Sequence, residues 1–155
     1  TKFKKFLGKL KIGAKIKIEG PFGQCVLHKN KKNPAAFLAG GIGITPLRSM
    51  IKYTTERKLP YRITLFYSNR NPEDAAFLDE LKELENKNKD FKLVAIMTRI
   101  TGHINPKIIK QNLEDWRKAI YYAVGSAGFV QAMANLLSEM KVKPENIKTE
   151  NFSGY

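Results

Sequence analysis

The stretch from Phe37 to Met50 constrains the fold of this chain most, because an apolar run ends in glycines and opens into a helical pattern. Residues 35–39 are typical of a strand that is buried on both faces. Gly40, Gly41 and Gly43 allow a tight turn in which the backbone can come close to a ligand. Strand, glycine turn and helix therefore follow one another in the order that builds an anion site.

Thr45 and Pro46 mark the expected start of the helix. Thr45 is a suitable N-cap residue, and Pro46 loses nothing by lacking an N–H group at the first helical position. Because a helix N-terminus favours negative charge, a pyrophosphate is the expected guest. The motif reads Gly-x-Gly-x-x-Pro, and a glycine turn can also be a plain connection between a strand and a helix. Both interpretations stay open at this point.

From Pro34 onward, strand patterns alternate with helix patterns, which predicts an α/β fold. We expect an open, doubly wound parallel sheet of about five strands, a Rossmann-like nucleotide-binding lobe. The expected strands are 35–39, 62–68, 91–97, 119–124 and 146–152. Asn71 is the expected N-cap of the second helix, with a buried stripe of Phe77, Leu78, Leu81 and Leu84. Residues 98–105 are expected to form a loop.

Residues 1–31 carry too little pattern to bury a core of their own. We expect a short helix over 1–7, a half-exposed strand over 15–19 and a further strand that starts in 24–28. Two strands and a helical turn are not independently stable. We therefore divide the chain into residues 1–31, which must pack on something outside this sequence or on the domain that follows, and a domain over 32–155.

Side chains at the carboxyl ends of the expected strands indicate a second part of the site. A second glycine turn covers 125–128, and Ser68 and Arg70 end the second strand. In a parallel sheet these turns lie along one edge, where ligands bind. A guanidinium can clamp a phosphate and a hydroxyl adds one bond, so an adenosine ribose or its phosphate is expected there. An acid that would bind the 2'-hydroxyl of NAD does not occur before Glu73. An ordinary turn residue and a solvated charge stay open as alternatives.

The formal net charge of +14, from 28 Lys and Arg against 14 Asp and Glu, favours an acidic partner. The lysines are spread along the chain, so we favour a solvated surface and expect no nucleic-acid partner. The single cysteine, Cys25, excludes an internal disulfide and fits a reducing compartment. No apolar run approaches the ~20 residues that span a bilayer, so we predict a cytoplasmic protein without membrane contact. His28 and His103 lack further ligands at suitable spacing, so no metal site is predicted.

Five segments stand in a fixed order along the chain. They are Gly20-Pro21-Phe22-Gly23, Leu38–Pro46, Tyr67–Arg70, Gly125–Ala127 and Glu150–Tyr155. In this order they resemble the ferredoxin-NADP reductase-like flavoprotein family over essentially the whole chain. The resemblance implies an antiparallel FAD-binding barrel followed by an NAD(P)-binding lobe, with hydride passing between nicotinamide C4 and flavin N5. Residues 1–31 would then be the last part of that barrel, whose Arg-x-Tyr-Ser flavin motif is missing.

The resemblance also implies roles for residues on the nucleotide side. Gly41, Gly43 and Thr45 would border the pyrophosphate and nicotinamide, in one turn with Gly40 and Pro46. Ser68 and Arg70 would meet the adenosine ribose and, if present, its 2'-phosphate. Gly125, Ser126 and Ala127 occupy the place of the family's Cys-Gly-Pro. Val124 stands where the family's cysteine is expected, which leaves a thiol contribution to hydride transfer open.

On the flavin side, Glu150 and Phe152 correspond to the family's terminal acid and to the aromatic residue near the flavin ring. The candidate catalytic residues are therefore Thr45, Glu150 and Phe152. The function implied is the NAD(P)H-binding part of an FAD-dependent oxidoreductase, with NADP or NAD and FAD as cofactors. Most of the FAD would be bound by a region outside this sequence.

The implied partners are an FAD-binding domain and an acidic electron carrier such as ferredoxin or flavodoxin. Hydride transfer needs two rings in close contact and little acid–base chemistry, so the absence of a catalytic triad does not argue against an enzyme. Two alternatives stay open: a non-catalytic subunit that senses nucleotide, and a basic module that binds nucleic acid or acidic proteins on the same scaffold.

Overall fold

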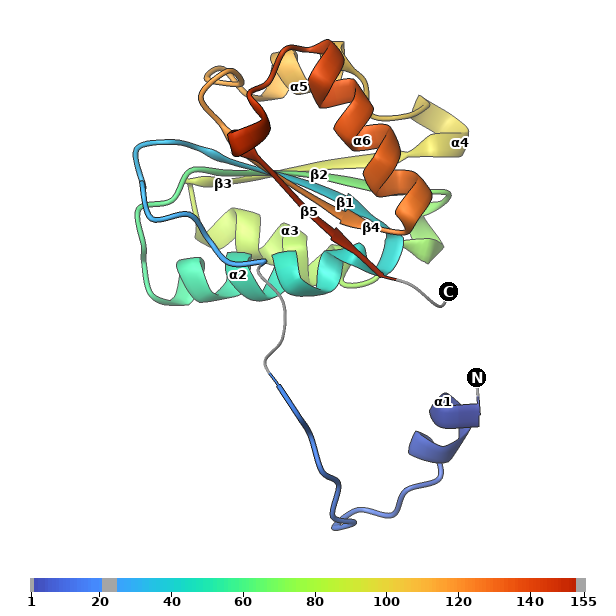
Figure 1. Cartoon of the computed structure of the whole chain (residues 1–155). Helices are drawn as coiled ribbons and strands as arrows, with labels where there is room; N and C mark the ends of the chain where they lie inside the picture. Colours follow the sequence, from blue (N-terminus) through green and yellow to red (C-terminus); the bar gives the residue numbers. More distant parts are fainter. Residues whose placement is uncertain (1, 21–24, 153–155) are drawn as a thin grey trace.

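The computed structural model describes residues 2–20 and 25–152, and a five-stranded sheet with helices on both faces forms its main body (Figure 1). All strand pairs are parallel, in the order β3-β2-β1-β4-β5. The strands are β1 Ala35–Gly40, β2 Ile63–Asn69, β3 Phe91–Met97, β4 Ile120–Gly125 and β5 Ile147–Asn151. Each of the five strands expected after Pro34 is thus found to within one residue at either end, and the doubly wound α/β fold is confirmed.

The helices that connect these strands cover both faces of the sheet. The α-helices are α1 Lys2–Leu7, α2 Ile44–Glu56, α3 Leu78–Lys87, α4 Thr98–Thr101, α5 Pro106–Asn112 and α6 Ala127–Glu139. Short 3-10 helices are η1 Gly41–Gly43, η2 Pro72–Asp74 and η3 Pro144–Asn146. Figure 1 shows α2 and α3 on one face, with α5 and α6 on the other.

Strand β1 lies in the centre of the sheet and is buried on both faces. Phe37 belongs to the core cluster shared with α2 and α3, whereas Leu38 belongs to the cluster shared with α5 and α6. Residues 35–39 are 0% exposed, which explains their continuous apolar run. Since α2 follows β1 on one face and α6 follows β4 on the other, the winding of the chain reverses between β1 and β4. Ligands of open α/β sheets bind at such a switch point.

The N-terminal part of the chain differs from the expectation. Helix α1 forms within the expected range 1–7, buries none of its residues and lies away from the sheet (Figure 1). Residues 15–19 and 25–28 form no strand, so both strand predictions were wrong. Alternation of charged and apolar residues favours a strand, but a strand also needs a hydrogen-bonded neighbour, and no described strand pairs with either segment. Residues 21–24, with most of the expected Gly-Pro-Phe-Gly turn, lie outside the described residues.

His28 fixes the segment before the sheet to strand β4. Its backbone N–H donates to the hydroxyl of Tyr122 (2.8 Å), and the hydroxyl of Tyr61 donates to its carbonyl (2.8 Å). The imidazole Nε2 lies 2.9 Å from the carbonyl oxygen of Asn33. Burial lowers the pKa of His28, which favours the neutral ring. His28 is therefore a loop residue with a packing role.

Two connections begin differently from the prediction. Asn71 and Asp74 form a capping box, but this box caps the N-terminus of the 3-10 helix η2. Helix α3 begins only at Leu78. Phe77 adopts a left-handed φ of 62° and is 42% exposed, so it does not belong to the buried stripe of α3. The loop expected over 98–105 begins with the one-turn helix α4, which ends at Thr101 and is followed by Gly102 with φ 76°.

Candidate functional site

A cleft of about 730 Å³ opens at the carboxyl ends of the four strands β1 to β4. Its walls come from the turns that follow these strands and from the last residue described. The lining residues are Gly40, Gly41, Ile42, Ser68, Asn69, Arg70, Asn71, Asp74, Thr98, Arg99, His103, Ser126, Phe129 and Phe152. Six residues predicted from the sequence are thus brought together on the sheet edge where ligands were expected. They are Gly40, Gly41, Ser68, Arg70, Ser126 and Phe152.

The three glycines of the first turn are required for three different reasons. Gly41 has φ 53°, and a Cβ added there would meet nothing within 4 Å, so this backbone is open for close approach. A Cβ on Gly40 would lie 2.6 Å from the ring of Phe129 in α6. A Cβ on Gly43 would overlap the carbonyl of Val124 in β4. Gly41 therefore faces the cleft, while Gly40 and Gly43 let the two glycine turns pack together.

Thr45 and Pro46 do not start helix α2, and the N-cap prediction for Thr45 was wrong. The 3-10 helix η1 leads directly into α2, which begins at Ile44 with Gly43 as its N-cap. The hydroxyl of Thr45 donates to the carbonyl of Ile42 (3.1 Å) and caps no backbone N–H. Pro46 is the third helical residue, where a missing N–H still costs no helical hydrogen bond. Neither residue lines the cleft.

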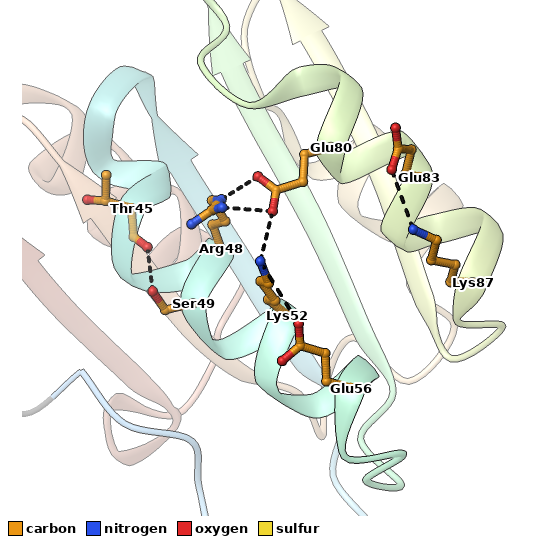
Figure 2. Close-up of polar contacts among 8 residues, drawn as sticks. All are labelled: Thr45, Arg48, Ser49, Lys52, Glu56, Glu80, Glu83 and Lys87. Atoms are coloured by element: carbon orange, nitrogen blue, oxygen red, sulfur yellow. Dashed lines mark hydrogen bonds and ion pairs between the residues drawn. The ribbon is translucent and has the colours of Figure 1, made fainter.

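Helix α2 is held against α3 by a cluster of charged side chains on the outer surface (Figure 2). The guanidinium of Arg48 donates to both carboxylate oxygens of Glu80, at 2.6 and 2.7 Å. Lys52 lies 3.6 Å from the same carboxylate, and the Arg48 guanidinium stacks over the ring of Phe77 at 4.5 Å. These contacts raise the pKa of Arg48 and lower that of Glu80, chiefly through their hydrogen bonds. They fix the helix that carries the first glycine turn.

The second glycine turn joins β4 to α6. Ser126 is the N-cap of α6, and its hydroxyl accepts a hydrogen bond from the N–H of Phe129 (3.4 Å). The carbonyl of Gly125 accepts from the N–H of Phe152 (2.9 Å), which holds Phe152 at the same turn. Gly125 and Ala127 do not line the cleft themselves. Residues 153–155, the end of the expected Glu-x-Phe-x-Gly-Tyr motif, lie outside the described residues.

The part of the cleft predicted to bind adenosine, at Ser68 and Arg70, includes further residues that were not predicted from the sequence. Thr98, Arg99 and His103 follow β3 and line the same cleft. The N–H of Arg99 donates to the carbonyl of Arg70, although the bond is long at 3.4 Å. No ion pair among the described residues involves either guanidinium. The sequence contains the pattern that would have predicted them, because Thr98 and Arg99 directly follow the third expected strand.

Asn69, the last residue of β2, lies deepest in this part of the cleft wall. It is 6% exposed, and neither its side-chain nitrogen nor its side-chain oxygen has a hydrogen-bond partner within the described residues. The hydroxyl of Tyr67, on the same face of β2, donates to the carbonyl of Ala76 (3.1 Å). Burial raises the pKa of Tyr67, against smaller opposing effects of Asn69 and Ala76. Asn69 is close enough to influence this hydroxyl but forms no well-aligned bond with it.

Glu150 lies elsewhere. It lines a separate cleft of about 870 Å³ along the edge strand β5, together with Cys25, Val26 and other residues of β5. Burial, followed by the neighbouring carboxylate of Glu150, raises the pKa of Cys25 to about 12. The structure therefore separates Glu150 from the cleft that contains Phe152, and it places no ionised thiol beside the glycine turns.

Within residues 2–20 and 25–152, no group of three or more His, Cys, Asp and Glu side chains could hold a metal ion. In the same ranges, none of the helices has the length and apolar character needed to cross a bilayer.

Comparison with known proteins identifies the family. A family model described as the oxidoreductase NAD-binding domain matches residues 37–135. Flavohemoprotein A of Dictyostelium discoideum is 30% identical over 145 residues, which cover 92% of this chain and 36% of that protein. Flavohemoglobin from Malassezia yamatoensis, solved with bound FAD and heme, superposes with a TM-score of 0.80 at 20% identity, over 96% of this chain and 40% of that one.

A mutant ferredoxin-NADP+ reductase from Plasmodium falciparum, in complex with 2'P-AMP, has a TM-score of 0.76 at 19% identity, over 97% of this chain and 66% of that one. The chain spans well under half of the Dictyostelium relative and of the flavohemoglobin. The matched residues run from β1 into α6 and include most of the cleft wall. The match confirms the expected resemblance and does not favour the nucleic-acid-binding alternative. This chain belongs to the oxidoreductase NAD-binding domain family, and the matches agree with the expected ferredoxin-NADP reductase-like family.

Proposed function

We propose that this chain is the NAD(P)H-binding part of an FAD-dependent oxidoreductase. The observation that carries the proposal is the cleft itself, in which Gly41, Ser126, Arg70 and Phe152 meet from four different segments. The residues fit a dinucleotide, because the backbone at Gly41 is open and two arginines line the opposite wall. A flavin bound next to this site would supply the acceptor for the hydride of the nicotinamide.

The pyrophosphate of the nucleotide would be held between the two glycine turns. The first turn offers the backbone at Gly41, and the N-terminus of α6 offers N–H groups next to Ser126. The adenosine end would lie against Ser68, Arg70 and Arg99, which can supply a hydroxyl and two guanidinium groups. The tasks of these residues are binding and orientation of the nucleotide.

The nicotinamide end would lie toward Phe152. The ring of Phe152 is half-buried against the core on the α2 side, and its backbone is fixed at Gly125. We place Phe152 beside the nicotinamide and near the flavin ring, where its side chain leaves the two reacting rings in contact and excludes water from them. Thr45 and Glu150 remain proposed members of this side of the site, although neither lines the same cleft.

An FAD-binding domain would complete the enzyme. We assign residues 1–31 to its last part, supported by helix α1, which buries nothing and exposes Phe3 by 67% and Phe6 by 61%. Among the described residues that line the cleft, only Phe129 and Phe152 are phenylalanines, so most contacts to FAD would come from outside this sequence. With a net charge of +14, the chain fits an acidic electron carrier such as ferredoxin or flavodoxin as acceptor. A cytoplasmic location stays a prediction from the single cysteine.

Titration calorimetry with NADPH, NADH and 2',5'-ADP tests nucleotide binding by the purified chain. We expect saturable binding of at least one of the three with 1:1 stoichiometry. The absence of binding by all three would overturn the proposal.

The preference for NADP rests on the arginines of the cleft. Arg70→Ala and Arg99→Ala should lower the affinity for NADPH more than the affinity for NADH, because only NADPH carries the 2'-phosphate that a guanidinium binds. Arg57→Ala is the matched control, since Arg57 lies at the far end of α2. An unchanged ratio of the two affinities in both cleft variants would show that the preference was wrongly argued.

A further inference from the structure

The side chain of Asn69 leaves a hydrogen-bonding requirement that the chain itself does not meet. It is the one buried side chain in the described part of the chain whose polar atoms lack every partner. Buried amides in folded proteins are almost always hydrogen-bonded, because removal from water without a replacement partner is costly. Since Asn69 also lines the candidate nucleotide cleft, the missing partner points to a ligand.

The polar groups around Asn69 are engaged with one another. Tyr67 donates to Ala76, and the side chain of Asn71 binds the carboxylate of Asp74 at 3.0 Å. Arg99 donates to the side-chain oxygen of Asn71 (3.4 Å). Asn69 influences the Tyr67 hydroxyl but forms no hydrogen bond that meets the geometry, so its amide is left available to the cleft.

We propose that the amide of Asn69 hydrogen-bonds a hydroxyl of the adenosine-side ribose of the bound nucleotide. This inference rests on the proposed function. The amide has donors on Nδ2 and an acceptor at Oδ1, so its full satisfaction needs both an acceptor and a donor on the ligand side. A phosphate oxygen only accepts, whereas a ribose hydroxyl does both. Ser68 and Arg70 flank Asn69 at the same strand end, which places Asn69 beside the groups assigned to the ribose and its phosphate.

Matched ligands separate a ribose contact from a general effect on the cleft. The probes are NADH, AMP, 2'-deoxy-AMP and 3'-deoxy-AMP, titrated into wild type, Asn69→Ala and Asn69→Leu. We expect both variants to bind NADH and AMP about 3- to 10-fold more weakly, the range for a neutral hydrogen bond. In wild type, removal of at least one ribose hydroxyl from AMP should lower its affinity by a similar factor. In both variants the deoxy analogue and AMP should bind with equal affinity.

Stability without ligand distinguishes a binding role from a structural one. Because the amide has no partner in the chain, Asn69→Leu should unfold at a temperature no lower than that of wild type. Asn86→Ala, on the exposed side of α3, is the control and should change neither affinity nor stability.

The outcomes are distinguishable. If wild type binds none of the nucleotides, the proposed function fails, and this inference fails with it. If wild type binds and both Asn69 variants bind equally well, only this inference is overturned. If the variants bind AMP more weakly but still bind the deoxy analogues more weakly than AMP by the wild-type factor, the proposed contact to the ribose is wrong.

Discussion

Gly43 lies so close to Val124 that a methyl group added to its α-carbon would overlap the carbonyl of Val124. This approach brings the first glycine turn onto the end of strand β4, next to the second turn at Gly125. The two turns share one cleft only because a backbone without a side chain separates them. Gly43 therefore shapes the candidate nucleotide cleft without lining it.

Gly43→Ala should destabilise the chain and abolish nucleotide binding, because the added methyl meets rigid backbone rather than a flexible side chain. Overpacking of this kind costs about 1–3 kcal/mol. Gly128→Ala is the control: a Cβ there meets nothing within 4 Å, and alanine in a helix gains up to about 1 kcal/mol. Urea unfolding and NADPH titration measure both effects. Wild-type stability of Gly43→Ala would show that the turns can separate without loss.

Glu80→Gln should lower the free energy of unfolding at pH 7 by about 0.5–1 kcal/mol, as expected for a well-formed pair near the surface. Arg48 lowers the pKa of Glu80, so this contribution exists above the pKa of the unfolded chain and disappears as pH falls through the lower pKa of the folded state. Wild type and variant should therefore become equally stable in strong acid.

Glu83→Gln provides the control for this prediction. Glu83 pairs with Lys87, but both side chains are about two-thirds exposed, so the change should be close to neutral at every pH (Figure 2). Equal effects of the two substitutions at pH 7 would contradict the role of Arg48 and Glu80 in joining α2 to α3.

Ser126 has two roles that can be separated by substitution. Ser126→Ala removes the N-cap of α6 and should lower stability by about 1 kcal/mol. Ser126→Asp keeps a capping oxygen but places a negative charge beside the proposed pyrophosphate, so it should retain stability and lose nucleotide affinity. Thermal unfolding and calorimetry on the same samples check both. Undiminished affinity of Ser126→Asp would place the phosphates elsewhere.

Cys25 should react slowly with iodoacetamide in the folded chain. Burial and Glu150 raise its pKa to about 12, so at pH 8 its thiolate is roughly a thousandfold scarcer than at the ordinary pKa. The rate should rise about tenfold per pH unit above pH 8, and Glu150→Gln should increase it. Alkylation of native chain as fast as that of chain in guanidinium would contradict this environment.

The sheet could be predicted from the sequence because its central strands are buried on both faces and appear as continuous apolar runs bounded by Gly, Pro or Asn. The starts of helices were less predictable. Asn71 is a true cap, but of a 3-10 turn, and the left-handed Phe77 delays α3. Residues 15–19 alternate like a strand, but pairing depends on a neighbour that local pattern does not report.

The site was predictable where one rule applied, namely that polar residues and glycines at the carboxyl ends of parallel strands meet. That rule found Ser68 and Arg70, and its use on the third strand would have found Arg99. Thr45 was misplaced because a 3-10 turn starts the helix early. The unsatisfied amide of Asn69 could not be read from sequence, since it depends on how all its neighbours pair.

The most direct measurement is a ¹H–¹⁵N NMR titration of the labelled chain with NADH and NADPH. Binding at the switch point between β1 and β4 predicts the largest amide shifts at Gly41, Arg70 and Ser126, with saturation at one nucleotide per chain. Shifts confined to Lys148 and Glu150 along β5, or no shifts at all, would contradict a nucleotide site in this cleft.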